Sequence, residues 1–357
     1  MPLLFLLSQL LLIPAHNSSP FIQPLCHPDD SSALLQFKKS FLVIVSSPSI
    51  PWIDESDCEK VGSWTLEGDK GDCCSWDGVE CDEDSGYVIG LDLRSSCLYG
   101  SINSNTSLFR LVHLQRLDLS YNHFNYSPIP PQVGNLSRLT YLNLNASMFS
   151  GPILFHLVNL MQLKVLYLHS NDFTNEIPVA ILNLTKLSVL ALGDNKLQGR
   201  IPNSIFNLTN LQYLGLVMNY FSGTVEFDKF VQLKHLIVLY LPYNQLSLLF
   251  KEPNANATFP KFQRLWLSSC NLSKFPDFLR NQDELELLNL SENNLRGTVP
   301  EWMLNVGKAS LKAISLANNF LTGFGQHPIL LSWTQHPQNK VTNMKKMSGR
   351  KHRNSIK

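Results

Sequence analysis

The sequence predicts an α/β repeat protein. It would be a solenoid of about ten coils, each adding one strand to a curved parallel sheet on the concave face. Two observations predict this fold. A pattern of leucines ending in an asparagine recurs every 23 to 26 residues between residues 87 and 334. Six of the seven cysteines lie between Cys26 and Cys97, where the repeats begin. Because one coil cannot bury its own leucines, the coils must stack, and the ends of the stack need caps.

The repeated pattern is L-x-x-L-x-L-x-x-N-x-L, as in LQYLGLVMNYF at residues 211–221. At a period near 24 residues this pattern indicates an array of leucine-rich repeats. The asparagine position of successive coils holds Cys97, Asn122, Ser147, Asn171, Asn195, Asn219, Asn244, Cys270, Asn293 and Asn319.

Each part of the pattern has a physical role. The central L-x-L predicts a short strand whose leucines point into the coil, while the residue between them faces outward. The asparagine follows the strand and is expected to be buried, with its amide bonding backbone groups of neighbouring coils. Serine or cysteine fits the same position. Cys97 and Cys270 are therefore interpreted as small buried residues, not as metal ligands or nucleophiles.

The first 86 residues predict export and a cap. Residues 3–13 form an apolar run, broken only by Ser8 and Gln9, that is too short to span a bilayer. It is typical of a signal peptide, assigned to residues 1–25, and the alternative is a buried helix. Residues 26–86 are assigned to the cap. In it, DDSSALLQFKKSF predicts a short amphipathic helix with an acidic and serine N-cap, which the cysteines would staple over the edge of the first coil.

The cysteines and the glycosylation sequons both favour an oxidising, extracellular compartment. Clustered cysteines indicate disulfides, and no C-x-x-C pair faces a second such pair or a histidine pair, so no metal site is expected. Ten N-x-S/T sequons predict a glycoprotein, although Asn17 falls within the signal peptide. The expected glycosylation sites are Asn105, Asn125, Asn135, Asn145, Asn183, Asn207, Asn256, Asn271 and Asn289.

Charge and hydropathy exclude other classes of protein. The formal net charge is +1, and residues 1–334 hold 22 of the 29 basic side chains and all 28 acidic ones, so nucleic-acid binding is not expected. No later run reaches the roughly 20 apolar residues that a membrane span needs. Residues 335–357 carry the other seven basic residues and few apolar ones. They are expected to form a disordered basic tail.

Three features make the sequence resemble the plant extracellular class of leucine-rich repeat proteins. They are the cap segments CHPDDSSALLQFKKSF and DCCSWDGVECD, a G-x-I/V-P turn after the strand, as in QGRIP and RGTVP, and the period itself. Within that class it resembles receptor-like proteins of the tomato leaf-mould resistance type. The resemblance implies the disulfides Cys26–Cys73 and Cys74–Cys81. It also implies a membrane helix after the repeats, and the lack of one before residue 357 favours a truncated product.

The concave sheet is the expected binding surface, because residues that flank the strand leucines form a continuous face. Exposed tyrosine and tryptophan often anchor interfaces, and the alternative is that these rings only cover the sheet. The rings at 167, 213, 240 and 266 are expected along one face, on neighbouring strands. The predicted binding residues are Asp118, Asn143, Tyr167, His169, Tyr213, Tyr240, Tyr243 and Trp266.

No motif indicates catalysis. H-E-x-x-H, the P-loop and G-x-S-x-G are absent and the ten histidines are scattered, so neither an enzyme nor a cofactor is expected. Two functions follow. One is the ligand-sensing part of a plant immune receptor in defence signalling, with a protein or peptide ligand from a pathogen and a leucine-rich repeat receptor kinase as co-receptor. The other is a soluble apoplastic binder, such as an inhibitor of pathogen cell-wall-degrading enzymes, or a non-signalling truncated product. A full-length form would sit in the plasma membrane.

Overall fold

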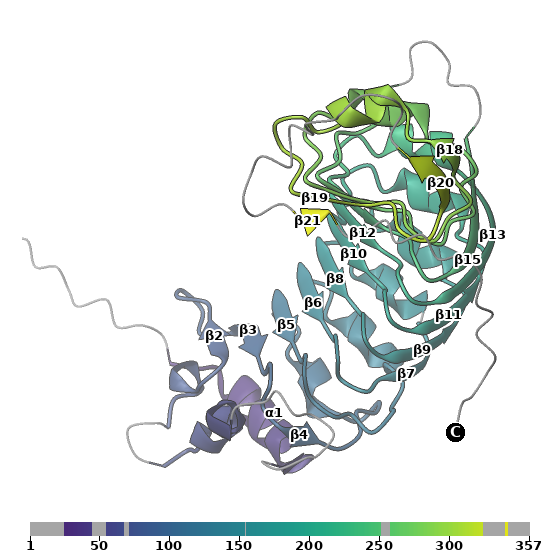
Figure 1. Ribbon diagram of the computed structural model, residues 1–357. Helices are drawn as coiled ribbons and strands as arrows, with labels where there is room; N and C mark the ends of the chain where they lie inside the picture. Colours follow the sequence, from purple (N-terminus) through teal and green to yellow (C-terminus); the bar gives the residue numbers. More distant parts are fainter. Residues whose placement is uncertain are drawn as a thin grey trace, which may run out of the picture.

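The chain forms a curved solenoid with the helix α1 at one end (Figure 1). This computed structural model describes residues 25–44, 55–67, 71–153, 155–250, 258–323 and 340–341. The expected signal peptide, except Leu25, lies outside the described residues, as do the sequon at Asn256 and all of the basic tail except residues 340–341. Among the residues described, no helix has the length and apolar character needed to cross a bilayer.

A twelve-stranded sheet lines the inner, concave side of the solenoid (Figure 1). Its strands are parallel except for the antiparallel pair of β2 and β3 at the N-terminal end. In sheet order the strands are β2 (Val79–Cys81), β3 (Val88–Asp92), β5 (Arg116–Asp118), β6 (Tyr141–Asn143), β8 (Val165–Tyr167), β10 (Val189–Ala191), β12 (Tyr213–Gly215), β14 (Val238–Tyr240), β16 (Arg264–Trp266), β17 (Leu287–Asn289), β19 (Ala313–Ser315) and β21 (Lys340–Val341).

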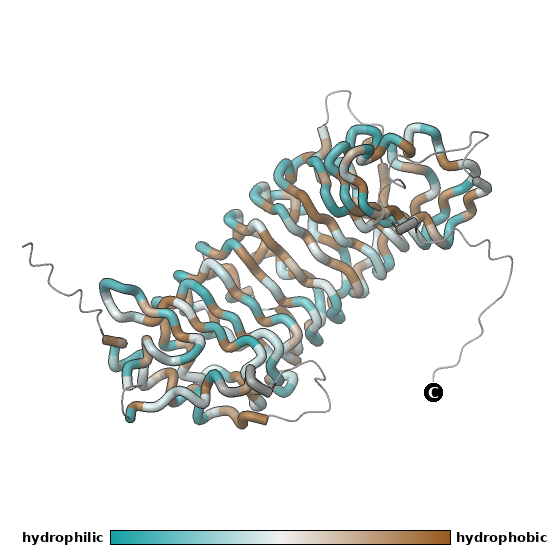
Figure 2. The backbone as a smooth tube through the Cα atoms, turned by 60° about the vertical axis from the view of Figure 1, so that its left-hand side comes forward, coloured by the Kyte–Doolittle hydropathy of each residue, from teal (hydrophilic) through white to brown (hydrophobic). Residues whose placement is uncertain are grey.

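The strand leucines set the register of this sheet and form its core. Leu166, Leu190 and Leu214 are partners across β8, β10 and β12, and all three are fully buried. Hydrophobic residues recur in coil after coil along the solenoid (Figure 2). The predicted solenoid with a concave parallel sheet is confirmed. Strand β21 is an addition, because the sequence predicted no element in the tail.

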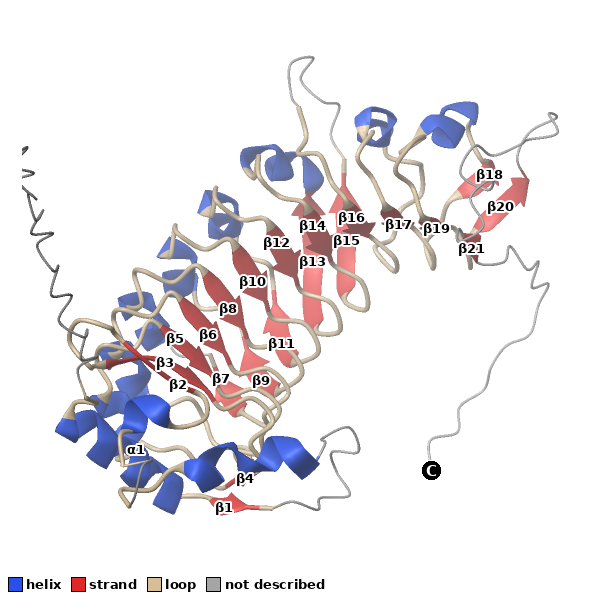
Figure 3. Cartoon of the chain, turned by 90° about the vertical axis from the view of Figure 1, so that its left-hand side faces the viewer, coloured by secondary structure: helices blue, strands red, loops and turns tan. Residues whose placement is uncertain are grey.

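A second parallel sheet lies behind the first (Figure 3). The sequence predicted only a turn at this place in each coil. Glycines with positive φ, such as Gly199 and Gly223, lie in the segments that form these strands. The sheet contains β7 (Ser150–Pro152), β9 (Asp172–Asn175), β11 (Lys196–Gly199), β13 (Tyr220–Glu226) and β15 (Gln245–Leu249), and a separate pair joins β18 (Arg296–Thr298) to β20 (Phe320–Gly323).

Short 3₁₀ helices cover the outer side of the coils (Figure 3). Several of them follow a proline, for example Pro178 and Pro202, whose extended backbone ends the preceding segment. Proline cannot donate to a ladder, so it separates the second strand from the helix. The helices are η4 (Ser107–Arg110), η5 (Pro131–Asn135), η6 (Phe155–Asn159), η7 (Val179–Asn183), η8 (Asn203–Asn207), η9 (Phe227–Gln232), η10 (Asp277–Asn281) and η11 (Glu301–Asn305).

The repeat asparagines form a ladder of amides. It is buried, as predicted, at Asn122, Asn195, Asn219 and Asn293, and half-buried at Asn171, Asn244 and Asn319. Asn195 is representative. Its Nδ2 donates to the carbonyls of Leu168, Leu192 and Gly193 at 3.0–3.1 Å, and its Oδ1 accepts from the backbone N–H of Phe173 at 3.0 Å. Leu168 and Phe173 belong to the preceding coil. Each such asparagine therefore satisfies backbone groups that the turns would otherwise leave unpaired.

The cap joins the first coil through α1 (Pro28–Lys39), the 3₁₀ helices η1 (Glu55–Ser63) and η3 (Cys73–Ser75), and the strand pair β1 (Leu42–Val43) and β4 (Leu98–Tyr99). The N-cap of α1 is His27, not the predicted acid or serine. Phe37 lies on the buried side of α1. The Phe41 ring meets the ring of Phe124 in the next coil edge-on, with the centroids 5.6 Å apart.

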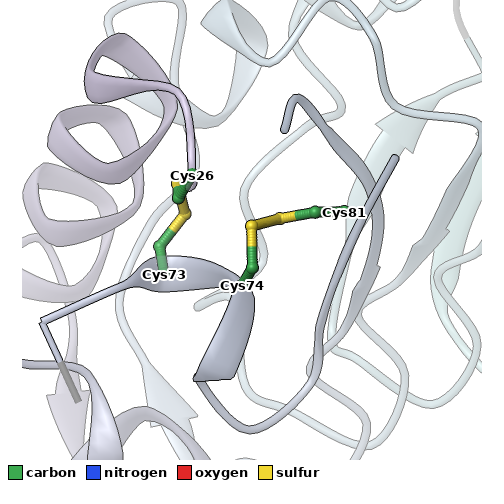
Figure 4. Close-up of side chains that lie close together, drawn as sticks. All are labelled: Cys26, Cys73, Cys74 and Cys81. Atoms are coloured by element: carbon green, nitrogen blue, oxygen red, sulfur yellow. A yellow bond between two sulfur atoms is a disulfide. The ribbon is translucent and has the colours of Figure 1, made fainter. Parts of the chain in front are cut away.

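Three disulfides fix the cap. Cys26–Cys73 and Cys74–Cys81 lie close together (Figure 4), with Cα–Cα distances of 5.4 and 5.5 Å. These are the pairs that the family resemblance implies. The third, Cys58–Cys97, was not predicted and corrects the interpretation of Cys97. That residue occupies an asparagine position, but it ties η1 to the first coil instead of serving only as a small buried residue.

Candidate functional site on the concave face

Two rows of side chains face the concave side, one on each side of the buried strand leucine. Each row runs in register from strand to strand. The first row is Gly90, Arg116, Tyr141, Val165, Val189, Tyr213, Val238, Arg264, Leu287 and Ala313. The second row is Asp92, Asp118, Asn143, Tyr167, Ala191, Gly215, Tyr240, Trp266, Asn289 and Ser315.

A polar network occupies the N-terminal part of these rows. The Asp118 carboxylate accepts from the Tyr141 hydroxyl at 3.2 Å and from the Asn143 amide at 2.9 Å. It also accepts from the backbone N–H and the hydroxyl of Ser120. Burial, followed by the charge of Asp118, raises the pKa of Tyr141 to about 12. The network is fully paired, so it holds Tyr141 and Asn143 in fixed positions.

An aromatic stripe occupies the middle of the face, over β12, β14 and β16. The ring centroids of Tyr213 and Tyr240 are 5.7 Å apart and meet edge-on, and those of Tyr240 and Trp266 are 4.6 Å apart. Gly215 makes room for this stripe, because a Cβ there would lie 2.9 Å from the Tyr213 ring. Burial raises the pKa of Tyr213 to about 12, so its phenol stays neutral at ordinary pH.

The aromatic residues form two groups rather than one continuous row. The Tyr167 ring meets the Tyr141 ring edge-on, with the centroids 6.1 Å apart. Strand β10 separates Tyr167 from Tyr213. The side chains that β10 presents are Val189 and Ala191. The expectation that the strands of all four rings are neighbours is therefore wrong for Tyr167. The aromatic stripe consists of Tyr213, Tyr240 and Trp266.

Two predicted binding residues lie at the edge of the face. His169 is half-buried, and its Nε2 is 2.9 Å from the Asn145 amide nitrogen. Burial lowers the pKa of His169, so the imidazole is neutral at neutral pH. Tyr243 follows β14 in a turn with φ of 56° and is 52% exposed.

The sequons differ in accessibility. Asn135, Asn183 and Asn207 are exposed and end the outer helices η5, η7 and η8. Asn105, Asn125 and Asn271 are also exposed, whereas Asn289 is half-buried on the concave strand β17. Asn145 is only 5% exposed, and its amide nitrogen, to which a glycan would attach, contacts His169. Among the described sequons, Asn145 is therefore the one whose asparagine is buried.

The cysteines and a cavity outside the sheet are weaker candidates for a functional site than the concave face, among the described residues. Cys26, Cys73, Cys74 and Cys81 have sulfur atoms within 4.8 Å of one another, but they are paired in disulfides and provide no thiolates for a metal. Cys270 is a buried thiol whose pKa burial raises to about 12, so it is not a reactive nucleophile. A cavity of about 890 Å³ lies outside the sheet, among Phe250, Phe259 and Phe278.

Comparison with known proteins agrees with this geometry. A family model described as a leucine-rich repeat region matches residues 92–322, and one described as a leucine-rich repeat N-terminal domain matches residues 27–82. The chain belongs to the leucine-rich repeat family. The matched N-terminal domain lies within the predicted cap, and the matched repeat region covers most of the predicted repeats.

The relatives of this leucine-rich repeat chain are plant receptor-like proteins. Receptor like protein 27 of Arabidopsis thaliana is 37% identical over 355 residues, which cover 86% of this chain and 41% of that protein. Receptor-like protein Cf-9 of Solanum pimpinellifolium is 44% identical over 115 residues, which cover 31% of this chain and 13% of that protein. The resemblance to this type of receptor is confirmed. The chain spans less than half the length of these relatives.

A solved structure with similar architecture contains a bound peptide. The ectodomain of the Arabidopsis receptor kinase HAESA, in complex with an N-terminally extended IDA peptide hormone, superposes with a TM-score of 0.59 at 26% identity. The match covers 82% of this chain and 45% of that chain.

Proposed function

We propose that this leucine-rich repeat chain is an extracellular recognition module that binds a peptide or an extended protein segment across its concave face. It acts as the ligand-sensing part of a plant receptor-like protein in defence signalling, with a receptor kinase of the same repeat class as its co-receptor. The proposal extends what the relatives share, because those proteins are receptor-like and the HAESA ectodomain binds a peptide hormone.

The aromatic stripe carries the proposal. Tyr213, Tyr240 and Trp266 are partly exposed on the concave side, and their rings touch in a continuous surface across three neighbouring strands. Their conformational freedom is already restricted by these contacts, so a ligand would lose little affinity to ordering them. Rigid, amphipathic rings of this kind are the residues that most often dominate binding energy.

The test uses the secreted chain and a displayed library of random 12-residue peptides. Binders selected on the wild type are synthesised, and their Kd values are measured by calorimetry for Tyr240→Ala and Trp266→Ala. Each substitution should weaken binding by more than about 1 kcal/mol, because truncating a central aromatic anchor typically costs at least that much.

The matched control is Tyr220→Ala. Tyr220 is 56% exposed in the second sheet, away from the concave face, and its removal should leave the Kd within twofold. Binders that lose affinity in the Tyr220 variant but not in the other two would place the site on the side of the solenoid and refute the proposal.

A further inference from the structure

A small hollow opens at the N-terminal end of the concave face. It has a volume of about 310 Å³ and lies over β2, β3 and β5. Glu80, Gly90, Arg116 and Tyr141 are register partners on four successive strands, so they form one line across its floor and walls. The hollow is continuous with the row of concave side chains described above, but it lies outside the aromatic stripe.

Gly90 makes room for the Glu80 side chain at this hollow. A Cβ at that position would lie 2.6 Å from Oε2 of Glu80 and 2.9 Å from its Cβ. In the first concave row, from Gly90 to Ala313, Gly90 is the one residue without a side chain. The missing side chain therefore lets the Glu80 side chain lie against Gly90, and its carboxylate lines the hollow.

The carboxyl groups around the hollow differ in what they already bind. Asp118 is fully occupied by Tyr141, Asn143 and Ser120. Asp92 accepts from Lys60 at 3.4 Å and from the backbone N–H of Arg94. The Glu80 carboxylate has no hydrogen bond and no ion pair within the part of the chain that the structure describes, although its backbone pairs with β3.

Arg116 is the one cationic residue, among those the structure describes, that lines the hollow, and its single positive charge does not neutralise the carboxylates there. The Arg116 guanidinium lies over the Tyr141 ring, 5.5 Å from its centroid. Three carboxylates and one guanidinium line the hollow, and Lys60 pairs with one of the carboxylates, Asp92, so the local charge stays negative. A concave site with one sign of charge concentrates ligands of the opposite sign, and Glu80 is the carboxylate free to pair with them.

We propose that this hollow is a pocket for a basic group of the ligand, a guanidinium or an ammonium, which pairs with Glu80 above Gly90. The proposal rests on the proposed function, because it assigns one end of the same peptide-binding face. From β3 to β16 there are seven strand spacings of about 4.8 Å, or about 34 Å. An extended peptide advances about 3.3 Å per residue. A ligand that reaches both the pocket and Trp266 therefore needs about ten residues between its basic group and its aromatic-binding part.

The same displayed library of 12-residue peptides tests the pocket. Wild-type binders should be enriched in arginine or lysine at one end and in apolar residues at the other. Glu80→Lys should weaken the binding of these peptides at least tenfold, and Glu80→Gln should weaken it less. The control is Glu83→Lys, which makes the same charge change at an exposed residue that does not line the hollow.

Three contrary results have different meanings. Binders that depend on Trp266 but lack a basic residue, or that tolerate Glu80→Lys, would overturn the pocket and leave the proposed function standing. Failure to select any peptide on the wild type would overturn the proposed function and the pocket with it. A loss of affinity in Glu83→Lys equal to that in Glu80→Lys would show a general charge effect and would also overturn the pocket.

Discussion

Replacing Asn195 by alanine tests the asparagine ladder at one coil. Two of its three carbonyl acceptors keep a second amide donor, Asn171 for Leu168 and Asn219 for Leu192. The third, Gly193, keeps the backbone N–H of Ser170. The Phe173 N–H loses its acceptor and stays buried. An unpaired buried donor costs about 1–3 kcal/mol and each lost neutral bond about 0.5–1.5 kcal/mol, so we expect a loss of about 2–4 kcal/mol in the free energy of unfolding.

Urea denaturation followed by circular dichroism measures this loss, with the slope of the transition checked for a change in cooperativity. Asn210→Ala is the matched control, because Asn210 is exposed and its amide makes one bond, to the Thr185 carbonyl. Asn195→Ser should fall between the two, since Ser147 at the equivalent position donates to the carbonyl of Leu119 in the preceding coil. A cost for Asn195→Ala within about 1 kcal/mol of the control would refute the reasoning, because an orphaned N–H alone exceeds that.

Three further outcomes are expected. Mass spectrometry of the secreted chain should find glycans at Asn183 and Asn207 but none at Asn145, whose amide is buried on His169; occupancy there would contradict the described packing. Removing the Cys58–Cys97 disulfide by serine substitution should cost about 2–4 kcal/mol, and an unchanged melting temperature would count against a structural role. Because burial raises the pKa of Tyr213 to about 12, the folded state holds this proton more tightly than the unfolded state, in which tyrosine titrates near pH ~10. The stability involved is complete below about pH 10 and lost towards pH 12, and Tyr213→Phe should reduce this dependence.

The core of the fold could be predicted from the sequence because its interactions repeat. Every coil places its leucines in the same environment, and seven of the ten place an asparagine at the same position, so ten weak indications add to one strong one. The second sheet was not predictable in this way. Its strands, such as Lys196–Gly199, are short and contain glycine and polar residues, so alternation is hard to see. Pairing with the neighbouring coil, not the local composition, makes them strands.

The other features that the sequence did not indicate depend on contacts between residues far apart in the sequence. The partner of Cys58 could not be assigned, because cysteine spacing alone does not determine connectivity. The sequon at Asn145 looks like the others, and only the packing of His169 from the next coil shows that it is buried. The aromatic stripe was placed correctly on the sheet, but its division at β10 follows from Val189 and Ala191, which a list of aromatic residues does not include.

The asparagine ladder has a direction. The amide of Asn195 reaches back to Leu168 and Phe173, and that of Asn219 reaches back to Leu192 and Leu197. A coil is therefore complete only when its successor is in place. A ribosome releases the cap first and then one coil after another. Each newly made coil thus meets the coil made just before it and supplies the amide that this coil still lacks, so synthesis and assembly can proceed in the same order.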